Sequence, residues 1–309
     1  MQIYLPIAEL SANLFFLMGL GGAVGFLSGL FGVGGGFLLT PLLIFSGIPA
    51  PVAVASVTGQ VVAASTSGAL SYYRQGGIDF HLALYLVLSG IIGSFFGVST
   101  FGALRGAGQL DLVISLGYFF FLGSIGSLLV YESVKSFLRN KKGEPRPRKI
   151  PGQHNWVHGL PLRVRFMRSN LYISVLPVLA IGLFIGFVGS LLGIGGGFIL
   201  VPALVYILRV PGNLVIGTSL LQVLAIMAAT TILHSINTQT VDIILAFNLM
   251  IGAVIGAQFG AALGQKMRGE QTRALLGIIV LAVALRFAWS LLRTPSDPFS
   301  VAIIGLGAG

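Results

Sequence analysis

Long apolar runs separated by short polar breaks divide the chain into ten segments. They fall at about 10–31, 33–47, 52–73, 79–103 and 109–138 in the first half, and at about 170–192, 194–208, 213–235, 240–265 and 271–293 in the second. Most exceed the ~20 residues that a helix needs to cross ~30 Å of hydrocarbon. The second segment of each half has only about 15 residues, or ~22 Å of helix. The pattern predicts an all-α polytopic membrane protein.

Composition supports lipid as the main solvent of this chain. Hydrophobic residues make up 55% of the 309 residues, charged residues only 8%, and the mean hydropathy is +0.96. A soluble domain is about a quarter charged, so this chain is too poor in charge for a water-facing surface. No Lys or Arg precedes Arg74, so the first apolar stretch lacks the basic start of a signal peptide and is expected to be retained. The absence of cysteine excludes disulfides and thiolate chemistry.

One glycine-dense motif occurs twice. The sequence GFLSGLFGVGGGF at 25–37 returns as GFVGSLLGIGGGF at 186–198, an offset of 161 (186 − 25) that Pro41 and Pro202 share. Non-helical backbone at membrane depth is tolerated only where it is buried in protein or lines a cavity. Paired interruptions in two halves of a transporter point to its binding site. The first two segments of each half are therefore either a re-entrant pair folded back at the Gly-Gly-Gly turn or two full spans.

Most basic residues lie between the two halves. The net charge is +10, and residues 135–168 alone hold ten Lys and Arg against one acid, Glu144. A basic loop between apolar spans indicates the cytoplasmic side and attracts anionic lipid headgroups, which accounts for the charge without nucleic acid. With this loop inside, the cytoplasmic side holds fifteen basic residues and the outer side two, Arg105 and Arg293.

The same charge bias sets the domain boundaries. We expect two inverted repeats of about five helical segments each, 1–138 and 170–293, a basic cytoplasmic linker, 139–169, and a C-terminal tail, 294–309. Each repeat then crosses the membrane an odd number of times, so both termini lie outside a bacterial inner membrane. The halves should superpose after a two-fold rotation about an axis in the membrane plane.

The glycine motif offers anion-binding chemistry. Its last glycines are Gly34, Gly35, Gly36, Gly195, Gly196 and Gly197. Glycine removes side chains where backbone must turn tightly or approach a ligand closely. Helices beginning at the middle glycines would present free N–H groups and a partial charge of about +0.5, which attracts an anion. The structural alternative is close helix packing alone. The motif is not a dinucleotide-binding fingerprint, because Phe37 occupies the position of its third glycine. It is not a P-loop either, because no Gly-Lys-Ser/Thr follows.

The third segment of each half carries a polar pair at helical spacing. Ser56 and Gln60 are four residues apart, and Thr218 and Gln222 repeat them with an offset of 162 (218 − 56). Residues four apart share a helix face, and a buried amide is costly in a span unless it finds a partner. These side chains either donate hydrogen bonds to a substrate anion or bond between helices. Secondary candidates nearby are Thr58, Ser65, Thr66 and Ser219.

A glycine ladder favours packing rather than chemistry. Gly252, Gly256, Gly260 and Gly264 recur every fourth residue, with a shorter counterpart of Ser89, Gly93 and Gly97 in the first half. Such a ladder is a close-packing face. It belongs either inside one chain or between the two chains of a homodimer.

Neither an enzyme, a metal nor another cofactor is predicted. The spans contain no HExxH and no Ser/His/Asp set, and the histidines lack metal-ligand spacing. His234 is expected at the membrane interface rather than as a ligand. Arg286, the one basic residue well inside a span, either contacts an anion or, as we expect, reaches toward the interface or pairs locally. The acids near the spans all fall at segment ends: Glu9, Asp79, Asp111, Glu132, Asp242 and Glu270. Without a titrating side chain in mid-span, anion efflux is expected to be electrogenic and uncoupled from protons.

The duplicated GxGGGF…P motif, the polar third segments and the basic linker resemble the TauE/SafE family of sulfite exporters and related anion permeases. The resemblance runs from about Gly19 to Leu292. It implies export of a small sulfur-containing anion, sulfite or an organosulfonate such as sulfoacetate. Without the resemblance, the residues predict only a small-anion transporter with a pseudosymmetric mid-membrane site. The alternative is a non-transporting membrane anchor or assembly subunit, which has no need for repeated glycine breaks and glutamines.

Overall fold

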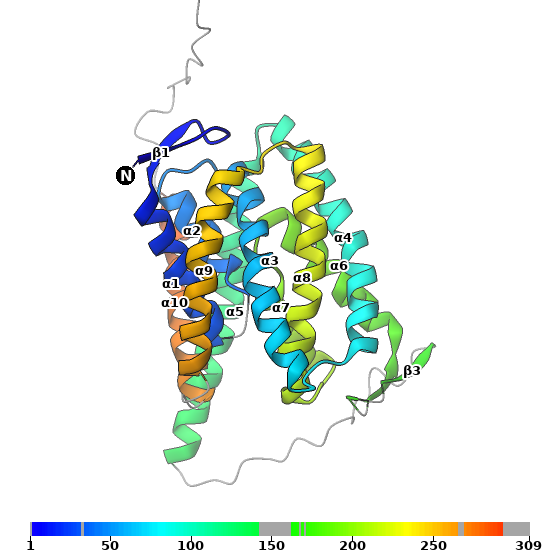
Figure 1. The fold of residues 1–309 in the computed structure, drawn as a ribbon. Helices are drawn as coiled ribbons and strands as arrows, with labels where there is room; N and C mark the ends of the chain where they lie inside the picture. Colours follow the sequence, from blue (N-terminus) through cyan, green and yellow to red (C-terminus); the bar gives the residue numbers. More distant parts are fainter. Residues whose placement is uncertain are drawn as a thin grey trace, which may run out of the picture.

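In the described part of the chain, ten helical segments form one bundle, as the apolar runs predict (Figure 1). The computed structural model describes residues 2–31, 34–141, 162–166, 168–169, 171–264 and 269–292. The first half contains α1 (Leu14–Phe31), α2 (Gly36–Phe45), α3 (Ala50–Arg74), α4 (Phe80–Gly106) and α5 (Leu110–Lys141). The second contains α6 (Val175–Leu192), α7 (Gly197–Pro202) with its continuation η2 (Ala203–Ile207), α8 (Gly212–Asn237), α9 (Ile243–Gly264) and α10 (Gly269–Leu292). The all-α polytopic fold class is confirmed.

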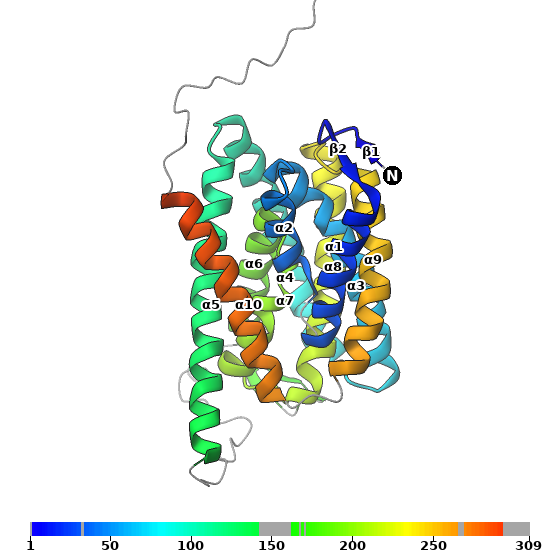
Figure 2. The ribbon, with the colours of Figure 1, turned by 90° about the vertical axis from the view of Figure 1, so that its left-hand side faces the viewer.

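Eight of these helices are long and apolar enough to cross a membrane, counted over the described residues. The two shorter apolar helices are Gly36–Phe45 and Gly197–Ile207, the second segment of each half. Figure 2 shows α1 running away from its hairpin end and α2 returning toward that same end. The chain therefore folds back at the first glycine turn, in the manner of a re-entrant pair.

Two β-hairpins were not predicted. Strands β1 (Gln2–Leu5) and β2 (Leu10–Asn13) pair before α1, and β3 (Arg163–Phe166) and β4 (Leu171–Ser174) pair before α6, both antiparallel. The expectation that the first and sixth helices begin near residues 10 and 170 is therefore wrong. The sequence Arg-Val-Arg-Phe of β3 alternates charged and apolar residues, and this period of two suits a half-buried strand rather than a helix.

The predicted linker, 139–169, overlaps two described elements: residues 139–141 belong to α5, and 163–166 form β3. Several features named from the sequence lie outside the described residues: 142–161, Gly32, Lys266, Arg268, Arg293 and the tail 294–309.

The closest helix pairs each join the two halves. Helix α1 packs along α9, α4 along α6, α3 along α8, and α5 along α10. The glycine ladder forms the first of these seams: a Cβ atom built on Gly256 would lie 2.8 Å from Phe26 N and 2.9 Å from the carbonyl carbon of Gly22. Gly252 and Gly260 meet the backbone of α1 in the same way. The ladder therefore packs inside one chain, and the homodimer stays a prediction.

The two hairpins occupy opposite ends of the bundle. Figure 1 shows β1 at the upper end and β3 at the lower end, where α5 also terminates. In Figure 2 the last turn of α10 lies at the same end as the N-terminus. Opposite ends for equivalent hairpins are what an inverted repeat requires, and the two-fold superposition itself stays a prediction.

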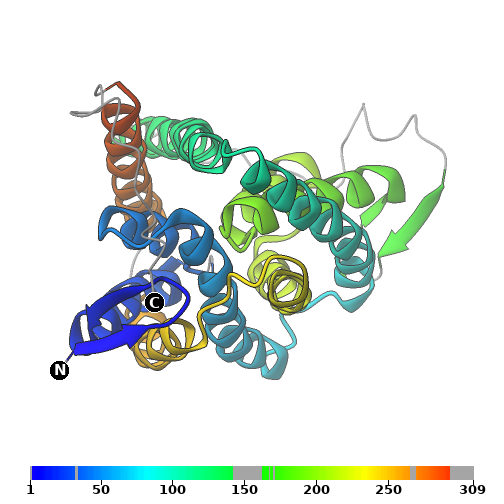
Figure 3. The same cartoon turned by 90° about the horizontal axis from the view of Figure 1, so that it is seen from above.

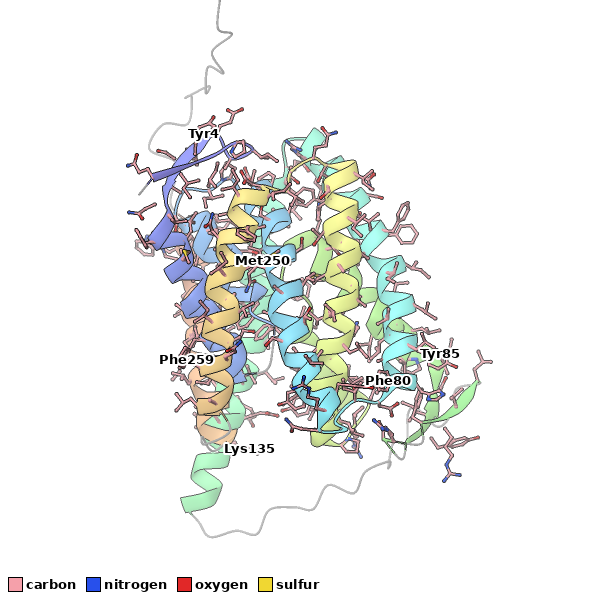
Figure 4. All side chains as sticks on the ribbon, viewed as in Figure 1. Tyr4, Phe80, Tyr85, Lys135, Met250 and Phe259 are labelled. Carbon is pink, nitrogen blue, oxygen red and sulfur yellow. The ribbon has the colours of Figure 1, made fainter. Side chains whose placement is uncertain are left out.

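The outer surface of the bundle is apolar. Seen from above, α5 and α10 stand together at its edge (Figure 3), and their membrane-spanning windows are only 28% buried. Phe259 on α9 is 68% exposed and points away from the bundle (Figure 4). Tyr4 lies near one end, and Phe80 and Tyr85 near the other (Figure 4). An outer surface with exposed apolar side chains such as Phe259 suits contact with lipid.

Candidate functional site

The first glycine turn has a backbone conformation that favours glycine. Gly34 and Gly35 have φ angles of 90° and 67°, in the left-handed region that other residues rarely adopt. Gly35 is the residue before α2, which begins at Gly36, one position later than predicted. Gly36 N–H donates to Gly34 O at 2.8 Å, so this donor is already used by the turn. The turn and the first residues of α2 are buried inside the bundle.

The second glycine turn has the same conformation. Gly193, Gly195 and Gly196 have φ angles of 68°, 77° and 73°. Gly196 precedes the helix, and its carbonyl accepts from Leu200 N–H at 2.8 Å. Because α7 runs directly into η2, one apolar helix extends from Gly197 to Ile207. The repeated sequence therefore produces a repeated turn followed by a short helix.

The two turns meet in the interior. A Cβ built on Gly36 would lie 2.8 Å from Gly193 O and 3.1 Å from Ile194 O, so no side chain fits between the turns. Phe37 and Phe198, equivalent positions of the two motifs, stack with ring centroids 4.7 Å apart and planes 9° apart. Both rings are buried. The structure thus brings together the two sets of predicted glycines. The phenylalanine that ends each copy of the motif stacks on its counterpart in the other copy.

The predicted glutamines are buried and have no protein partner. Gln60 on α3 and Gln222 on α8 are both 0% exposed, and neither the amide oxygen nor the amide nitrogen of either side chain makes a hydrogen bond. Each directly precedes a valine that contacts the turns. A Cβ on Gly34 would lie 3.6 Å from Val223 Cγ1 and 3.9 Å from Val61 Cγ1. An unpaired buried amide costs about 1–3 kcal/mol, so a polar ligand at these atoms would be strongly stabilised.

A third unpartnered group, the hydroxyl of Ser65, lies against the first turn. The side chain is 0% exposed, and its Oγ has no hydrogen-bond partner and lies 3.6 Å from the Cβ position of Gly34. The equivalent residue in the second half is Met227 (65 + 162). Ser65 is only a secondary candidate in the sequence analysis. Donor groups are therefore richer beside the first turn.

The second turn is held by side chains instead. Tyr118 on α5 donates its hydroxyl to Leu192 O at 2.6 Å, and Thr40 on α2 donates to Gly193 O at 3.4 Å. The position equivalent to Thr40 in the other half is the apolar Val201 (40 + 161), and α10, the counterpart of α5, contains no tyrosine. The two turns thus share a backbone shape but differ in the polar groups around them.

Ser56 and Thr218 hold helices together. Asp242 N–H donates to Ser56 Oγ at 2.9 Å, and Asp79 N–H donates to Thr218 Oγ1 at 3.1 Å. Each hydroxyl therefore fixes the start of a helix from the other half. Of the two sequence interpretations, the geometry favours bonding between helices for this pair.

Each of these acids also anchors a hairpin of the other half. Asp79 Oδ1 accepts from Leu82 N–H at 3.2 Å, and Oδ2 accepts from the Ser169 N–H at 3.1 Å and hydroxyl at 2.5 Å. Asp242 Oδ2 likewise accepts from Ile7 N–H at 3.1 Å. Both carboxylates are at most 2% exposed. Their offset of 163 (242 − 79) is a signal that sequence analysis missed.

Two further candidates from the sequence are His234 and Arg286. His234 is buried, with Nε2 3.1 Å from Ser190 O and Nδ1 3.2 Å from Thr238 Oγ1, so the ring is held inside the bundle between α8 and α6, and its position at the membrane interface stays a prediction. The exposed Arg286 places its guanidinium 5.2 Å from the centroid of the Phe45 ring. Among the described residues, no three His, Asp or Glu side chains are grouped to hold a metal ion.

Comparison with known proteins agrees with this architecture. Residues 17–287 match the family described as sulfite exporter TauE/SafE. A "probable membrane transporter protein" of Xylella fastidiosa (strain 9a5c) is 29% identical over 281 residues, 90% of this chain and 95% of that protein. The "probable membrane transporter protein YjnA" of Bacillus subtilis (strain 168) is 28% identical over 273 residues, 87% of this chain and 97% of that protein. No solved structure matches. Since the family match covers most of the chain, this multi-pass membrane protein belongs to the TauE/SafE sulfite exporter family.

Proposed function

We propose that the protein exports a small sulfur-containing anion, sulfite or an organosulfonate such as sulfoacetate, across a bacterial inner membrane. The observation that carries this proposal is the pair of buried glutamines, Gln60 and Gln222, whose amides have no protein partner; the residues that follow them, Val61 and Val223, contact both glycine turns. Amide and hydroxyl donors suit the oxygens of an oxyanion. The family description names sulfite exporters, which supports the substrate class. The site belongs in mid-membrane, where the two turns face each other.

We place the linker end of the bundle in the cytoplasm and both chain termini outside. Lys135 lies near the lower end of α5, the end that leads into the linker (Figure 4). The excess of basic residues in the loops at this end supports the assignment. Anionic lipid headgroups are the partners that such a linker attracts.

Gln60→Leu and Gln222→Leu should each weaken transport and leave the fold intact, and the double variant should abolish transport. Leucine removes an amide that nothing in the protein satisfies, so the free energy of unfolding should hold or rise by about 1–3 kcal/mol. Transport should fall because the anion loses one of its donors. The measurements are efflux of labelled sulfite from proteoliposomes and the midpoint of thermal unfolding in detergent.

Gln258→Leu is the matched control. Gln258 is an amide in the α9 span that is exposed on the outer surface, so its replacement should leave efflux unchanged. Full activity in the double Gln60/Gln222 variant would reject the proposed site. If wild-type protein moves no sulfur oxyanion faster than empty liposomes, the alternative of a non-transporting membrane anchor or assembly subunit gains support.

Efflux should follow the membrane potential rather than the proton gradient. A cytoplasm-negative potential favours anion exit by about 2.3 kcal/mol per charge per 100 mV, so a waste anion needs no coupling ion. A strong-acid sulfonate is the best probe because it remains a monoanion. Its efflux should rise with an imposed potassium-diffusion potential and change little when only the pH gradient is varied. Dependence on the pH gradient at clamped voltage would show proton coupling.

A further inference from the structure

Two equivalent valines lie against both glycine turns. Val61 on α3 and Val223 on α8 occupy matching positions (61 + 162), and their side chains are 0% and 1% exposed. A Cβ built on Gly195 would lie 2.9 Å from Val61 Cγ1 and 3.7 Å from Val223 Cγ1. The same two methyl groups would lie 3.9 Å and 3.6 Å from a Cβ built on Gly34. Each valine therefore contacts the turn of the other half as well as the turn of its own half.

The valines leave no room for an anion against the turns. A Cβ built on Gly36 would lie 2.6 Å from Val61 Cγ2, so a single added carbon overlaps Val61 at Gly36 and again at Gly195. A sulfonate group is larger than a methyl group, so it enters only when the valines and the turns move apart. Valine is β-branched and holds one strongly preferred rotamer in a helix, so its methyl groups cannot swing aside. The width of the opening therefore depends on the size of these two side chains.

One polar group lies at the same place. The hydroxyl of Ser65 has no hydrogen-bond partner and lies 3.6 Å from the Cβ position of Gly34, the glycine that both valines contact. An anion that reaches the first turn would meet a donor there, beside the methyl groups. Binding and size selection thus have separate side chains, a hydroxyl for the first and the valines for the second.

We propose that Val61 and Val223 are specificity-determining residues that set the upper width of the anion that passes the turns. The inference rests on the proposed function and narrows its substrate class to slim oxyanions. Methyl groups make no hydrogen bonds, so they discriminate by volume, and one methylene too many in an apolar pocket lowers the rate about 10–200-fold. A sulfonate group on a short chain passes, and the same group on a broad ring does not.

The test compares efflux of methanesulfonate and benzenesulfonate from proteoliposomes of the full-length protein, with empty liposomes as background. Both are strong-acid monoanions with the same head group, so they differ in width and not in charge. Wild-type protein should release methanesulfonate at least about tenfold faster. The double variant Val61→Ala with Val223→Ala removes four methyl groups and should raise the benzenesulfonate to methanesulfonate ratio about tenfold or more.

Two outcomes of this comparison overturn the inference and leave the export function standing. One is equal release of the two sulfonates by wild-type protein, and the other is an unchanged ratio in a transport-active double variant. If wild-type protein releases neither a sulfonate nor sulfite faster than empty liposomes do, the export function is rejected and the inference with it.

Three further variants separate width from polarity, binding and general loosening. Val61→Thr keeps the branched shape and replaces a methyl group with a hydroxyl, so the ratio should stay at the wild-type value. Ser65→Ala should slow both sulfonates and leave their ratio unchanged. Val57→Ala removes the same methyl groups from a side chain on α3 that is also 0% exposed, while the turn glycines have other nearest neighbours. A rise in the ratio in Val61→Thr or Val57→Ala as large as in the double alanine variant would reject the inference.

A labelling experiment tests the same inference if the alanine variants fail to fold. The chain has no cysteine, so Val61→Cys and Val223→Cys each introduce a single thiol of nearly the volume of valine. The sulfonate-bearing reagent 2-sulfonatoethyl methanethiosulfonate should modify both variants and stop methanesulfonate efflux, and excess methanesulfonate should slow the modification. Val57→Cys should not react. A transport-active Val61→Cys and Val223→Cys pair that both stay unmodified would show that these side chains lie off the path of the anion.

Discussion

Gly256→Leu should leave little folded protein in the membrane. A Cβ at this position would overlap Gly22 O and lie 2.8 Å from Phe26 N, so the new side chain meets backbone that has nowhere to move. Overpacking a close interface costs about 1–3 kcal/mol, and a clash with backbone exceeds that range because the two helices must separate. The measurement is the yield of monodisperse protein on size-exclusion chromatography, together with its thermal unfolding midpoint.

Gly19→Leu is the control for this change. Gly19 lies on α1, the partner helix, with no atom within 4 Å of its Cβ position. The same substitution should therefore be tolerated there. Normal yield and unfolding temperature for Gly256→Leu would mean that α1 and α9 do not pack as described.

Gly35→Leu and Gly196→Leu should each reduce transport to the level of empty liposomes while the protein remains inserted and monodisperse. Both positions have left-handed φ angles, 67° and 73°, that cost a side-chain-bearing residue about 1–2 kcal/mol. A Cβ at Gly35 would lie 3.0 Å from Ser28 Cβ, and one at Gly196 would overlap Ile185 Cγ2. A leucine therefore fills the space directly before the short helix, where we place the anion. Labelled sulfite efflux is the measurement.

Gly47→Leu separates backbone strain from obstruction of the site. Gly47 also has a left-handed φ, 90°, but nothing lies within 4 Å of its Cβ position. Its substitution carries a similar backbone cost in open space and should preserve transport. Wild-type efflux in both Gly35→Leu and Gly196→Leu would disprove a role for the turns.

The helical bundle could be predicted because lipid imposes one rule on each segment. A span must be apolar and long, so the helices fall within a few residues of the expected ranges. The hairpins could not be predicted in this way. They are short and lie outside the run of apolar sequence, and the contacts that stabilise them, Asp79 with Ser169 and Asp242 with Ile7, link residues distant in the chain.

Part of the candidate site could also be predicted from the sequence. Repetition at a fixed offset identified the glycine turns and the glutamines, since a duplicated sequence retains what both copies need. The roles of Ser56 and Thr218 could not be predicted from the sequence. A hydroxyl can donate or accept a hydrogen bond with a ligand or with a neighbouring helix, and only the structure shows which helix is the neighbour. Ser65 and Tyr118 could not be identified in this way because the second half does not repeat them: Met227 stands at the position equivalent to Ser65, and α10, the counterpart of α5, contains no tyrosine.

The crossed helix pairs set the order in which the protein can assemble. Helix α1 packs along α9, and 211 residues (32–242) separate the end of one from the start of the other. At 5–20 residues per second, a ribosome needs about 10–40 s to synthesise that stretch. During this time the glycine-lined face of α1 has only lipid beside it. The main partners of α3, α4 and α5 are also made later, so a truncated chain that stops at the linker has almost no completed helix seam and is a ready target for membrane proteases.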